Sequence, residues 1–540
     1  MNFAAFNSKA IIVLFATALF ASFAALWSLD PGAYLAIMRY WIDIPQPAPF
    51  GDAAFVIGQL ECWRAGVDVY LTNTCDIYHR VNVYSPLWLR LWFLPAGRQA
   101  IMPFGAAIVA CFIASLAVLP KIERKSGIVL LLIALASPPV AYGVERGNID
   151  LLMFAFAALA IICLDGPVLA RVAGYALIML AALLKLYPAV LLVLLLRERP
   201  KFANALAICA LVVLGAFAFG WHDELIQMFR NIPQPAFHDD GLGGSRLADG
   251  LVQLGDRLLA LFNDDATAAP VRFYAQRGAV MGLVGLLTLG FAALARWLAR
   301  PGALPDAFAA LNQREQLCFV AGGALFCGCF ITGNSVVYRE TLLLFALPAL
   351  FRFQHVTSLP GVVRITGWIA VGLMWSVPLG DAVQAMFGDM TDAVWHAPSF
   401  AFWIAREVLW WWVFAVMVSG LICFARLARG EHQAISVMAA PTSPLRLGGE
   451  GQGEQLSFSF RHRVPLRRGC HRARLRQGQA AARWPSAILD LGRARWPMRS
   501  RSGRRNGPCA GRTKEHPIRL PPLAASGPIP GQPGPSHSTW

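Results

Sequence analysis

A lysine and a proline interrupt a long apolar run near the middle of this chain. The run covers residues 172–196 and contains Lys185 and Pro188. A lysine inside a membrane span costs roughly 2.5–3.5 kcal/mol on insertion scales, so intramembrane charges are functional candidates. Pro188 removes a backbone donor and disfavours helix at Tyr187. Lys185 could hold a phosphate and Tyr187 could stack on a sugar, or the lysine could simply pair with a carboxylate elsewhere in a helix bundle.

An early acidic residue is the second candidate. Asp52 follows Gly51 in the polar segment after the first apolar run. A carboxylate there could act as the general base for attack by a hydroxyl group. It could equally bind a metal ion or cap a helix, because Asp is a preferred N-cap residue. The residues alone leave these three roles open.

Two polar turns add cations and hydrogen-bonding groups at the ends of apolar runs. In the first, Arg146 suits bidentate phosphate or carboxylate recognition, and Asn148 could bond a sugar hydroxyl. The alternative is a plain turn in which Glu145 pairs with Arg146 and Asn148 caps the next helix. In the second, Tyr338 and Arg339 repeat the pairing of an aromatic ring with a cation, although interfacial tyrosines are commonly anchors. We take all five as candidate substrate-binding residues.

Other classes of site find no support. The sequence has no Gly-x-x-x-x-Gly-Lys phosphate loop, no His-Glu-x-x-His, no series of Cys-x-x-Cys pairs and no Gly-x-Ser-x-Gly. We therefore predict no metal site and no cofactor. Without a nucleotide-binding domain, a donor substrate would most simply be lipid-linked. Cys62 and Cys75 share one polar loop and could pair if that loop is extracytoplasmic.

Composition indicates a polytopic, all-α membrane protein. Of the 540 residues 57% are hydrophobic and 14% charged, and the mean hydropathy is +0.52. The net charge is +16, but residues 431–540 hold 17 Arg and one Lys against five acidic residues and so account for +13 of it. Because the preceding part is nearly neutral, its basic residues inform topology, and no nucleic-acid partner is expected.

Apolar runs near 20 residues predict the membrane helices. These runs are 10–29, 101–119, 127–144, 149–164, 202–220, 279–299, 316–332, 362–380 and 404–425, with a short one at 341–351. With a broken, re-entrant pair at 172–196 we expect about 10–11 membrane helices. Clusters of Lys and Arg place both termini of the membrane domain in the cytoplasm, if 172–196 is a hairpin of two half-helices. The alternative is a single span with one basic loop on the wrong side.

This topology places the polar loops together on the extracytoplasmic face. They cover about 30–100, 145–150, 221–278, 332–340 and 381–403, and a hairpin tip at Lys185 would face the same side. Their convergence predicts one site. We predict a membrane domain over residues 1–430 and a disordered tail over 431–540, which is rich in Arg, Gly, Pro and Ser. That tail is either a translated frameshift or a basic segment for anionic lipid or nucleic acid.

These residues, taken in order, resemble glycosyltransferase family 87, formerly a domain of unknown function. The family is similar to the polyprenol-phosphate-mannose-dependent mannosyltransferases of the GT-C fold. The resemblance covers roughly residues 50–350. Its motifs are the Gly-Asp pair at 51–52, Ala-Gly-Val-Asp-Val-Tyr at 65–70, Tyr-Ser-Pro-Leu at 84–87, Gly-Asn-Ile-Asp-Leu-Leu at 147–152, Leu-Lys-Leu-Tyr-Pro at 184–188 and the step at 333–343.

The resemblance implies a hexosyl, by default mannosyl, transfer in a bacterial-type plasma membrane. The sugar would pass from a polyprenyl-phosphate donor to a glycan or lipid acceptor on the outer face, with inversion at the anomeric carbon. The family's base would be Asp52 here, and Lys185 would contact the donor phosphate. Many relatives read Gly-Gln-Val-Asn where this chain has its 146–150 turn, and Tyr-Pro-Pro where it has Tyr84-Ser-Pro, so mannose is only the family default.

Two other functions fit the same features. Broken helices and intramembrane charges are also typical of a transporter or lipid flippase, although no second, equivalent broken helix is evident in the other half of the sequence. A non-catalytic scaffold of a polysaccharide assembly complex is the third possibility. An enzyme would need a groove open to the outer face and to lipid, whereas a transporter would need a pathway at the bilayer midplane.

Overall fold

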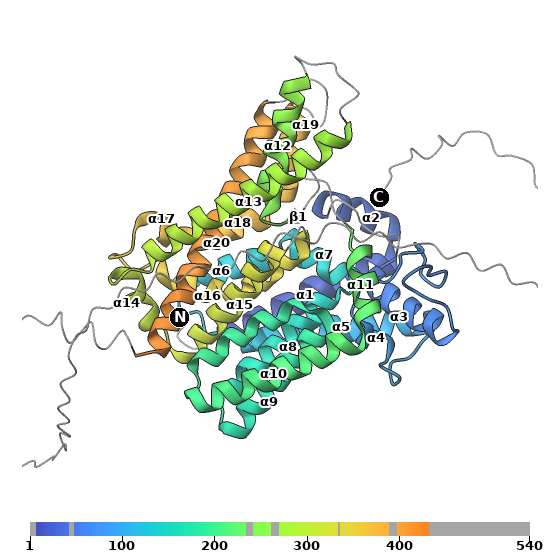
Figure 1. Ribbon diagram of the computed structural model, residues 1–540, viewed down its shortest axis with the longest axis horizontal. Coiled ribbons are helices and arrows are strands. Elements are labelled where there is room, and N and C mark those ends of the chain that lie inside the picture. Colours follow the sequence, from blue (N-terminus) through green and yellow to red (C-terminus); the bar gives the residue numbers. More distant parts are fainter. Residues whose placement is uncertain are drawn as a thin grey trace, which may run out of the picture. The chain divides into compact units, whose positions relative to one another are not determined.

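Helices make up most of the chain that the structure describes (Figure 1). This structure is a computed structural model, and it describes residues 7–42, 48–233, 241–260, 269–332, 335–387 and 397–430. These residues belong to one compact unit. The predicted tail, residues 431–540, lies outside the described residues, so its separation from the membrane domain stays a prediction.

The first half of the chain forms helices α1 (Ser8–Leu29), α2 (Pro31–Trp41), α3 (Gly51–Arg64), α4 (Pro86–Leu89), η1 (Arg98–Ala100), α5 (Ile101–Ser115), η2 (Leu116–Val118), α6 (Lys125–Leu135), α7 (Pro138–Arg146), α8 (Ile149–Leu164), α9 (Val168–Lys185), η3 (Tyr187–Arg197), α10 (Pro200–Gly220) and α11 (His222–Asn231).

The second half forms α12 (Ser245–Ala260), α13 (Ala269–Leu298), α14 (Ala303–Ala309), α15 (Gln313–Thr332), η5 (Val337–Phe345), α16 (Leu347–Phe353), α17 (Gly361–Arg364), α18 (Thr366–Met374), α19 (Ser376–Phe387) and α20 (Ala397–Ala428). The described strands are β1 (Gly241–Leu242) and β2 (Ser335–Val336). They pair antiparallel and place the start of η5 beside the segment that precedes α12.

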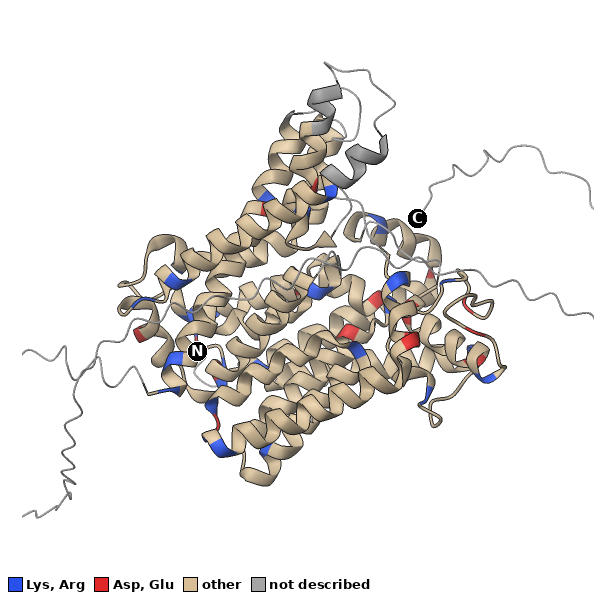
Figure 2. Ribbon diagram, viewed as in Figure 1, with Lys and Arg blue, Asp and Glu red and all other residues tan. Residues whose placement is uncertain are grey.

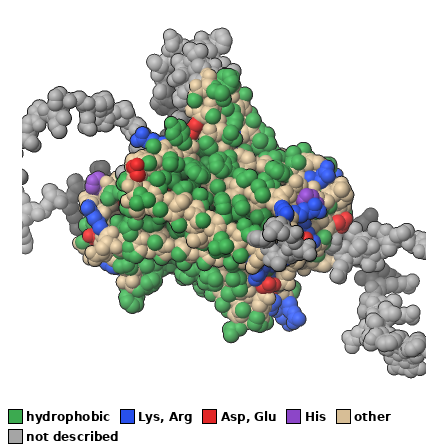
Figure 3. Space-filling view, turned by 180° about the vertical axis from the view of Figure 1, so that it is seen from behind, with side chains coloured by type: hydrophobic (Ala, Val, Ile, Leu, Met, Phe, Trp, Pro, Cys, Tyr) green, Lys and Arg blue, Asp and Glu red, His purple; other side chains and the backbone are tan. Residues whose placement is uncertain are grey.

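The chain is a multi-pass membrane protein, and the predicted all-α fold is confirmed. Within the described ranges, seven helical stretches are long and apolar enough to cross a membrane, and two bent pairs raise the number to nine. Helices α8 and η3 are apolar but shorter, and counting them brings the total into the predicted range. Hydrophobic side chains cover much of the face seen in Figure 3. Such a surface suits contact with lipid tails, because hydrocarbon imposes no cost on exposed apolar groups.

Two of the predicted uninterrupted spans are broken in the structure. Helices α6 and α7 bend by 46° at the segment before Pro138, and α18 and α19 bend by 64°. Pro138 and Pro139 cannot donate backbone hydrogen bonds to a continuing α6, but they suit the first turn of a new helix, where those donors are free in any case. The first break turns α7 so that its C-terminal residue Arg146 ends at the polar turn.

Residues 168–198 double back on themselves, as the hairpin prediction requires. The Tyr175 hydroxyl donates to the Leu194 carbonyl (3.1 Å), and Arg171 pairs with Glu198 (3.4 Å). The prediction of two half-helices was wrong in detail. The first arm, α9, is a full 18-residue α-helix, about 27 Å long. The return arm η3 is a 3₁₀-helix of 11 residues, which reaches about 22 Å because this helix rises faster per residue.

Two of the basic stretches predicted to be cytoplasmic, at Lys9 and at residues 121–125, lie together at one end of the helix bundle. The Ile122 amide beside Lys121 donates to the Ser8 hydroxyl at the start of α1 (3.3 Å). At the same end Arg314 pairs with Asp165 (3.9 Å). Figure 2 shows most charged residues towards the two ends of the helices and few along their middle. The polar turn at Arg146 lies at the other end of α8 from Asp165.

The first polar segment contains helices α2, α3 and α4, and a disulfide closes part of it. Cys62, near the end of α3, is bonded to Cys75, and their Cα atoms are 5.7 Å apart. The pairing that the sequence left open is therefore present. It ties the loop carrying Asp76 and Arg80 to the helix that carries Asp52.

Replacing both bonded cysteines by serine lowers the free energy of unfolding by about 3 kcal/mol, because a closed loop of this length restricts the unfolded chain by that amount. The thermal midpoint of the purified protein measures the effect. The matched control replaces Cys111 and Cys209, two exposed free cysteines, and leaves the midpoint unchanged. Equal midpoints for both pairs would contradict a stabilising disulfide.

Candidate functional site

Asp52 is placed at the N-terminus of α3 by a strained residue before it. Phe50 has φ 67°, a left-handed conformation that costs a bulky side chain energy and persists only where the surroundings enforce it. Its ring occupies the space where a side chain on Gly105 would stand, 2.3 Å from the ideal Cβ position. Its amide donates to the Glu145 carbonyl (2.6 Å). These contacts fix the entry to α3 against the 145–150 turn.

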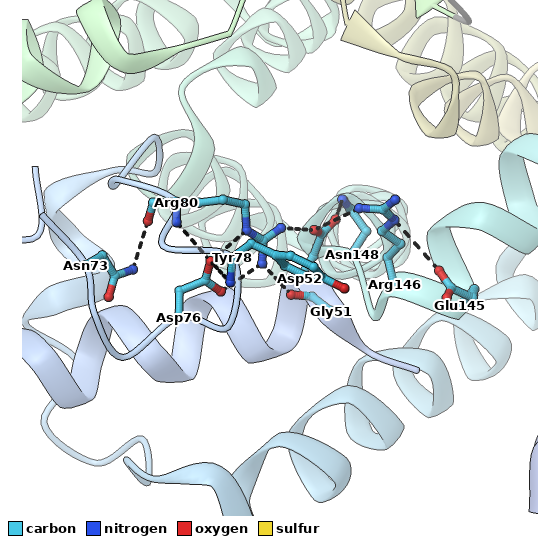
Figure 4. A network of polar contacts seen from close by, with 9 residues as sticks. All are labelled: Gly51, Asp52, Asn73, Asp76, Tyr78, Arg80, Glu145, Arg146 and Asn148. Carbon is cyan, nitrogen blue, oxygen red and sulfur yellow. Dashed lines mark hydrogen bonds and ion pairs between the residues drawn. The ribbon is translucent and has the colours of Figure 1, made fainter. Parts of the chain in front are cut away.

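The Asp52 carboxylate is held between two arginines and an amide. Its Oδ1 lies 3.2 Å from Arg80 Nη1 and 3.9 Å from Arg146 Nη1. Its Oδ2 accepts a hydrogen bond from Asn148 Nδ2 (2.6 Å). Figure 4 shows the carboxylate between the Arg80 loop and the turn that carries Arg146 and Asn148. The side chain does not cap α3, so the capping alternative is excluded.

The described part of the chain offers no set of ligands for a metal ion at Asp52. No group of three or more His, Cys, Asp or Glu residues there could hold one. The nearest charged neighbours of the carboxylate are guanidinium groups, which repel a cation. The arrangement suits a carboxylate that accepts a proton or a hydrogen bond.

Arg80 belongs to this site and was missed by the sequence analysis. Asp76 accepts from its Nε and Nη2 (3.0 Å each), and the Gly51 carbonyl accepts from Nη2 (2.8 Å). The guanidinium lies over the rings of Phe55 (4.6 Å) and Tyr78 (5.2 Å). Burial lowers the pKa of Arg80, but hydrogen bonding to Asp76 and the charge of Asp52 outweigh it and raise the pKa above its usual value. No motif marks this residue, because an Asp and an Arg four apart in a loop are common.

Replacing Arg80 by Lys is expected to lower turnover by about 10- to 100-fold. Lysine keeps the charge, but it cannot bridge Asp76 and Asp52 with a planar fork, and misplaced catalytic groups cost rates of this size. Arg39→Lys, an exposed exchange in the same polar segment, is the matched control. A variant as active as the wild type would show that Arg80 does not position the carboxylate.

The 145–150 turn combines structural contacts with a contact to Asp52. Arg146 Nε lies 3.7 Å from Glu145, and its guanidinium covers the Tyr142 ring at 4.4 Å. Asn148 Oδ1 accepts from the Asp150 amide (2.8 Å) and caps α8. The Glu145–Arg146 pair and the Asn148 cap therefore both exist, as the plain-turn alternative predicted. Asn148 is fully buried, and its contact with a sugar stays a prediction.

Lys185 and Arg339 converge on a buried carboxylate, Asp150. Lys185 Nζ is 2.7 Å from Asp150 Oδ1, and Arg339 Nε is 3.6 Å from Oδ2. The Tyr187 hydroxyl also donates to Oδ1 (2.8 Å), and Arg339 lies 5.3 Å from the Tyr187 ring. Leu186, at the hairpin tip, has φ 32°, a strained conformation that turns the chain between the lysine and the tyrosine. The pairing of this lysine with a carboxylate, which the sequence left open, is therefore present, although the helix ends at Lys185 and does not continue through it.

The Asp150 group is more than an isolated ion pair. Two cations surround one carboxylate, so these three side chains carry a net charge of +1. Removal of a buried carboxylate would leave both cations uncompensated, which is strongly unfavourable. This local excess of positive charge suits the binding of a second anion beside Lys185 and Arg339. A phosphate group fits this requirement, because it is anionic and accepts several hydrogen bonds.

The two ionic groups form one continuous site. Only one residue separates Asn148, which contacts Asp52, from Asp150, so their Cα atoms are at most about 7 Å apart. Two stacked aromatic rings also connect the Asp52 group with the Asp150 group. The ring centroids of Tyr142 and Tyr338 are 6.0 Å apart, and Lys185 Nζ lies 5.8 Å from the centre of the Tyr338 ring. The eight residues predicted from sequence lie in this one region: Asp52, Glu145, Arg146, Asn148, Lys185, Tyr187, Tyr338 and Arg339. It also contains Asp76, Arg80, Tyr84, Tyr142 and Asp150.

The comparison with protein families bears directly on this region. The model of glycosyltransferase family 87 matches residues 82–314, which include the 145–150 turn and the hairpin with Lys185. Over this stretch the chain matches glycosyltransferase family 87. No curated protein and no solved structure matches the chain.

The match with family 87 indicates a membrane glycosyltransferase and favours the enzyme over the transporter and scaffold alternatives. The matched region begins after Asp52 and Arg80 and ends before Arg339. These three residues are joined to it by the contacts with Arg146, Asn148 and Asp150 described above. Their roles therefore rest on geometry.

Proposed function

We propose that this family 87 protein transfers a hexosyl residue, by default mannosyl, from a polyprenyl-phosphate donor to a glycan or lipid acceptor. The transfer occurs in a GT-C-type site on the extracytoplasmic face and inverts the anomeric carbon. One observation carries the proposal. A carboxylate, Asp52, and a pair of cations, Lys185 and Arg339, lie at the two ends of one short turn.

The chemistry needs these two groups and a gap between them. The acceptor oxygen attacks the anomeric carbon while its proton passes to Asp52. The bond from that carbon to the phosphate oxygen breaks, and the phosphate leaves with its bonding electron pair. Lys185 and Arg339 stabilise the charge that develops on the leaving phosphate. Inversion requires base and leaving group on opposite faces of the sugar, so the sugar would lie between Asp52 on one side and Lys185 and Arg339 on the other.

The aromatic residues of the site suit a sugar ring between these charges. Tyr84 lies 5.2 Å from Lys185 Nζ, and Tyr338 stacks with Tyr142. Tyrosine offers an apolar face for the ring C–H groups and a hydroxyl for hydrogen bonding. The candidate roles of Tyr187, Glu145 and the other substrate-binding residues remain part of this proposal.

Two observations support an extracytoplasmic site. The Cys62–Cys75 bond lies in the segment that carries Asp52, and disulfides persist in oxidising compartments. The basic clusters gather at the opposite end of the bundle, which the positive-inside rule assigns to the cytoplasm. We therefore place both ends of residues 1–430 in the cytoplasm of a bacterial-type plasma membrane.

Transfer assays on membranes containing the full chain test the function. Radiolabelled polyprenyl-phosphate mannose, polyprenyl-phosphate glucose and the corresponding nucleotide sugars are supplied in parallel. We expect label from a polyprenyl-phosphate sugar to enter a lipid or glycan fraction. We expect no transfer of label from a nucleotide sugar when polyprenyl-phosphate synthesis is blocked. Transfer from the nucleotide sugar alone would overturn the lipid-linked donor.

A further inference from the structure

We infer that Asn148 is a positioning residue for the Asp52 base, in addition to capping α8. This inference rests on the proposed function. It assigns to Asn148 a role in addition to the sugar contact that its residue type suggested. The inference rests on two hydrogen bonds of one buried side-chain amide. The Asn148 amide donates to the Asp52 carboxylate and accepts from the backbone of Asp150, the residue that pairs with Lys185 and Arg339.

Both ends of the Asn148 side chain are engaged. Oδ1 accepts from the Asp150 amide (2.8 Å), and Nδ2 donates to Asp52 Oδ2 (2.6 Å). The residue has no exposed surface. Gly147, the residue before Asn148, ends α7 in the left-handed conformation with φ 57°. This conformation lets the chain turn sharply from α7 to Asn148 at the start of α8. The amide is therefore held in place from both sides.

Capping alone does not require asparagine here. Asp, Ser and Asn are about equally good N-cap residues, because each offers an oxygen to the helix amides. Only asparagine among them combines that oxygen with an N–H donor on the same rigid group. At this position the donor is used on Asp52. The choice of asparagine is therefore explained by the hydrogen bond to Asp52 and not by capping alone.

The amide orients the carboxylate, while the arginines compensate its charge. Arg80 engages Oδ1 and Asn148 engages Oδ2, so rotation of the carboxylate plane is blocked at both oxygens. An uncharged donor achieves this without a further positive charge, which would weaken the base. Each oxygen keeps a free lone pair for the acceptor hydroxyl. The other charged or titratable groups facing Asp52 are Arg146, Tyr84, Lys185 and Tyr338.

Two substitutions separate positioning from capping. Asn148→Asp keeps the cap oxygen but places a second carboxylate against Asp52, and two carboxylates at this distance do not both ionise. Asn148→Ser keeps the cap and removes the amide N–H donor. The acidic limb of the pH–rate profile is expected to move up by about one pH unit or more in Asn148→Asp. Turnover at the pH optimum is expected to fall by about 10-fold or more in Asn148→Ser.

Asn312 provides a matched control. It caps α15 in the same way, with Oδ1 accepting from the Glu315 amide (3.0 Å), and it does not contact Asp52. Asn312→Asp and Asn312→Ser are expected to leave the pH–rate profile unchanged. If the Asn148 variants behave like the Asn312 variants at equal expression and thermal midpoint, Asn148 is a cap only and the inference is overturned.

An infrared measurement keeps the test independent of transfer activity. The carboxyl C=O stretching band that Asp52→Asn removes from the spectrum of the full chain is followed as pH is lowered. We expect this band to grow at a higher pH in Asn148→Ser than in the wild type, because the donor to the charged form is lost. An unchanged band overturns the inference even if no transfer is found. Absence of transfer by the wild type instead counts against the proposed function.

Discussion

Replacement of Asp52 by Asn is expected to reduce sugar transfer by about 10³-fold or more, into the background of the assay. The amide cannot accept the acceptor proton, and a general base contributes typically 10²–10⁴-fold. Arg80 keeps its pair with Asp76 and its bond to the Gly51 carbonyl, so no buried cation is orphaned and the fold is expected to survive. The measurement is the initial rate of transfer in membranes, normalised to protein amount.

Asp30→Asn is the matched control for this experiment. Asp30 caps α2 through its side chain, lies in an exposed position of the same polar segment, and asparagine caps equally well. It is expected to keep full activity. If Asp52→Asn transferred sugar at the wild-type rate, Asp52 would not be the base, and Glu145 and Asp150 would be the carboxylates to test next.

Lys185→Gln is expected to lower kcat/KM for the lipid-linked donor by about 10²- to 10³-fold. Removal of one preorganised donor to a developing negative charge costs about this much. Asp150 would keep Arg339 and Tyr187 as partners, so its charge stays compensated. A loss concentrated in kcat would show that the lysine acts mainly on the leaving phosphate in the transition state, whereas a loss concentrated in KM would show ground-state binding.

The control for this exchange is Lys201→Gln, an exposed lysine at the start of α10. Its neutralisation is expected to leave both kinetic constants unchanged. Equal activity of Lys185→Gln and wild type would reduce Lys185 to a structural partner of Asp150. In that case the thermal midpoint alone would respond.

The hairpin could be predicted from sequence because its signals are local. Lys185 and Pro188 make an uninterrupted span unfavourable whatever surrounds them, since one adds a charge and the other removes a backbone donor. The breaks before Pro138 and within 366–387 were not predicted. A proline at the start of a helix and one inside it look alike until the neighbouring helices are known.

The sequence singled out most residues of the candidate cluster, but it did not indicate which of them pair. Asp52, Lys185, Tyr338 and Arg339 stood out because a polar residue beside an apolar run is costly unless it is used. Arg80 and Asp76 lie in a polar loop, where charged residues cost nothing and therefore carry no signal. Only the fold shows that the Cys62–Cys75 bond brings this loop onto Asp52.

The sequence by itself determined the class of the protein: a multi-pass helical membrane protein with a broken segment at Lys185. These features follow from hydropathy, charge and proline, which act residue by residue. The tertiary structure alone decided that Asp150 is the common partner of Lys185 and Arg339, and that Asn148 reaches Asp52. These contacts join residues that are 35 to almost 190 positions apart in the sequence. They depend on how the helices pack, which no local sequence pattern encodes.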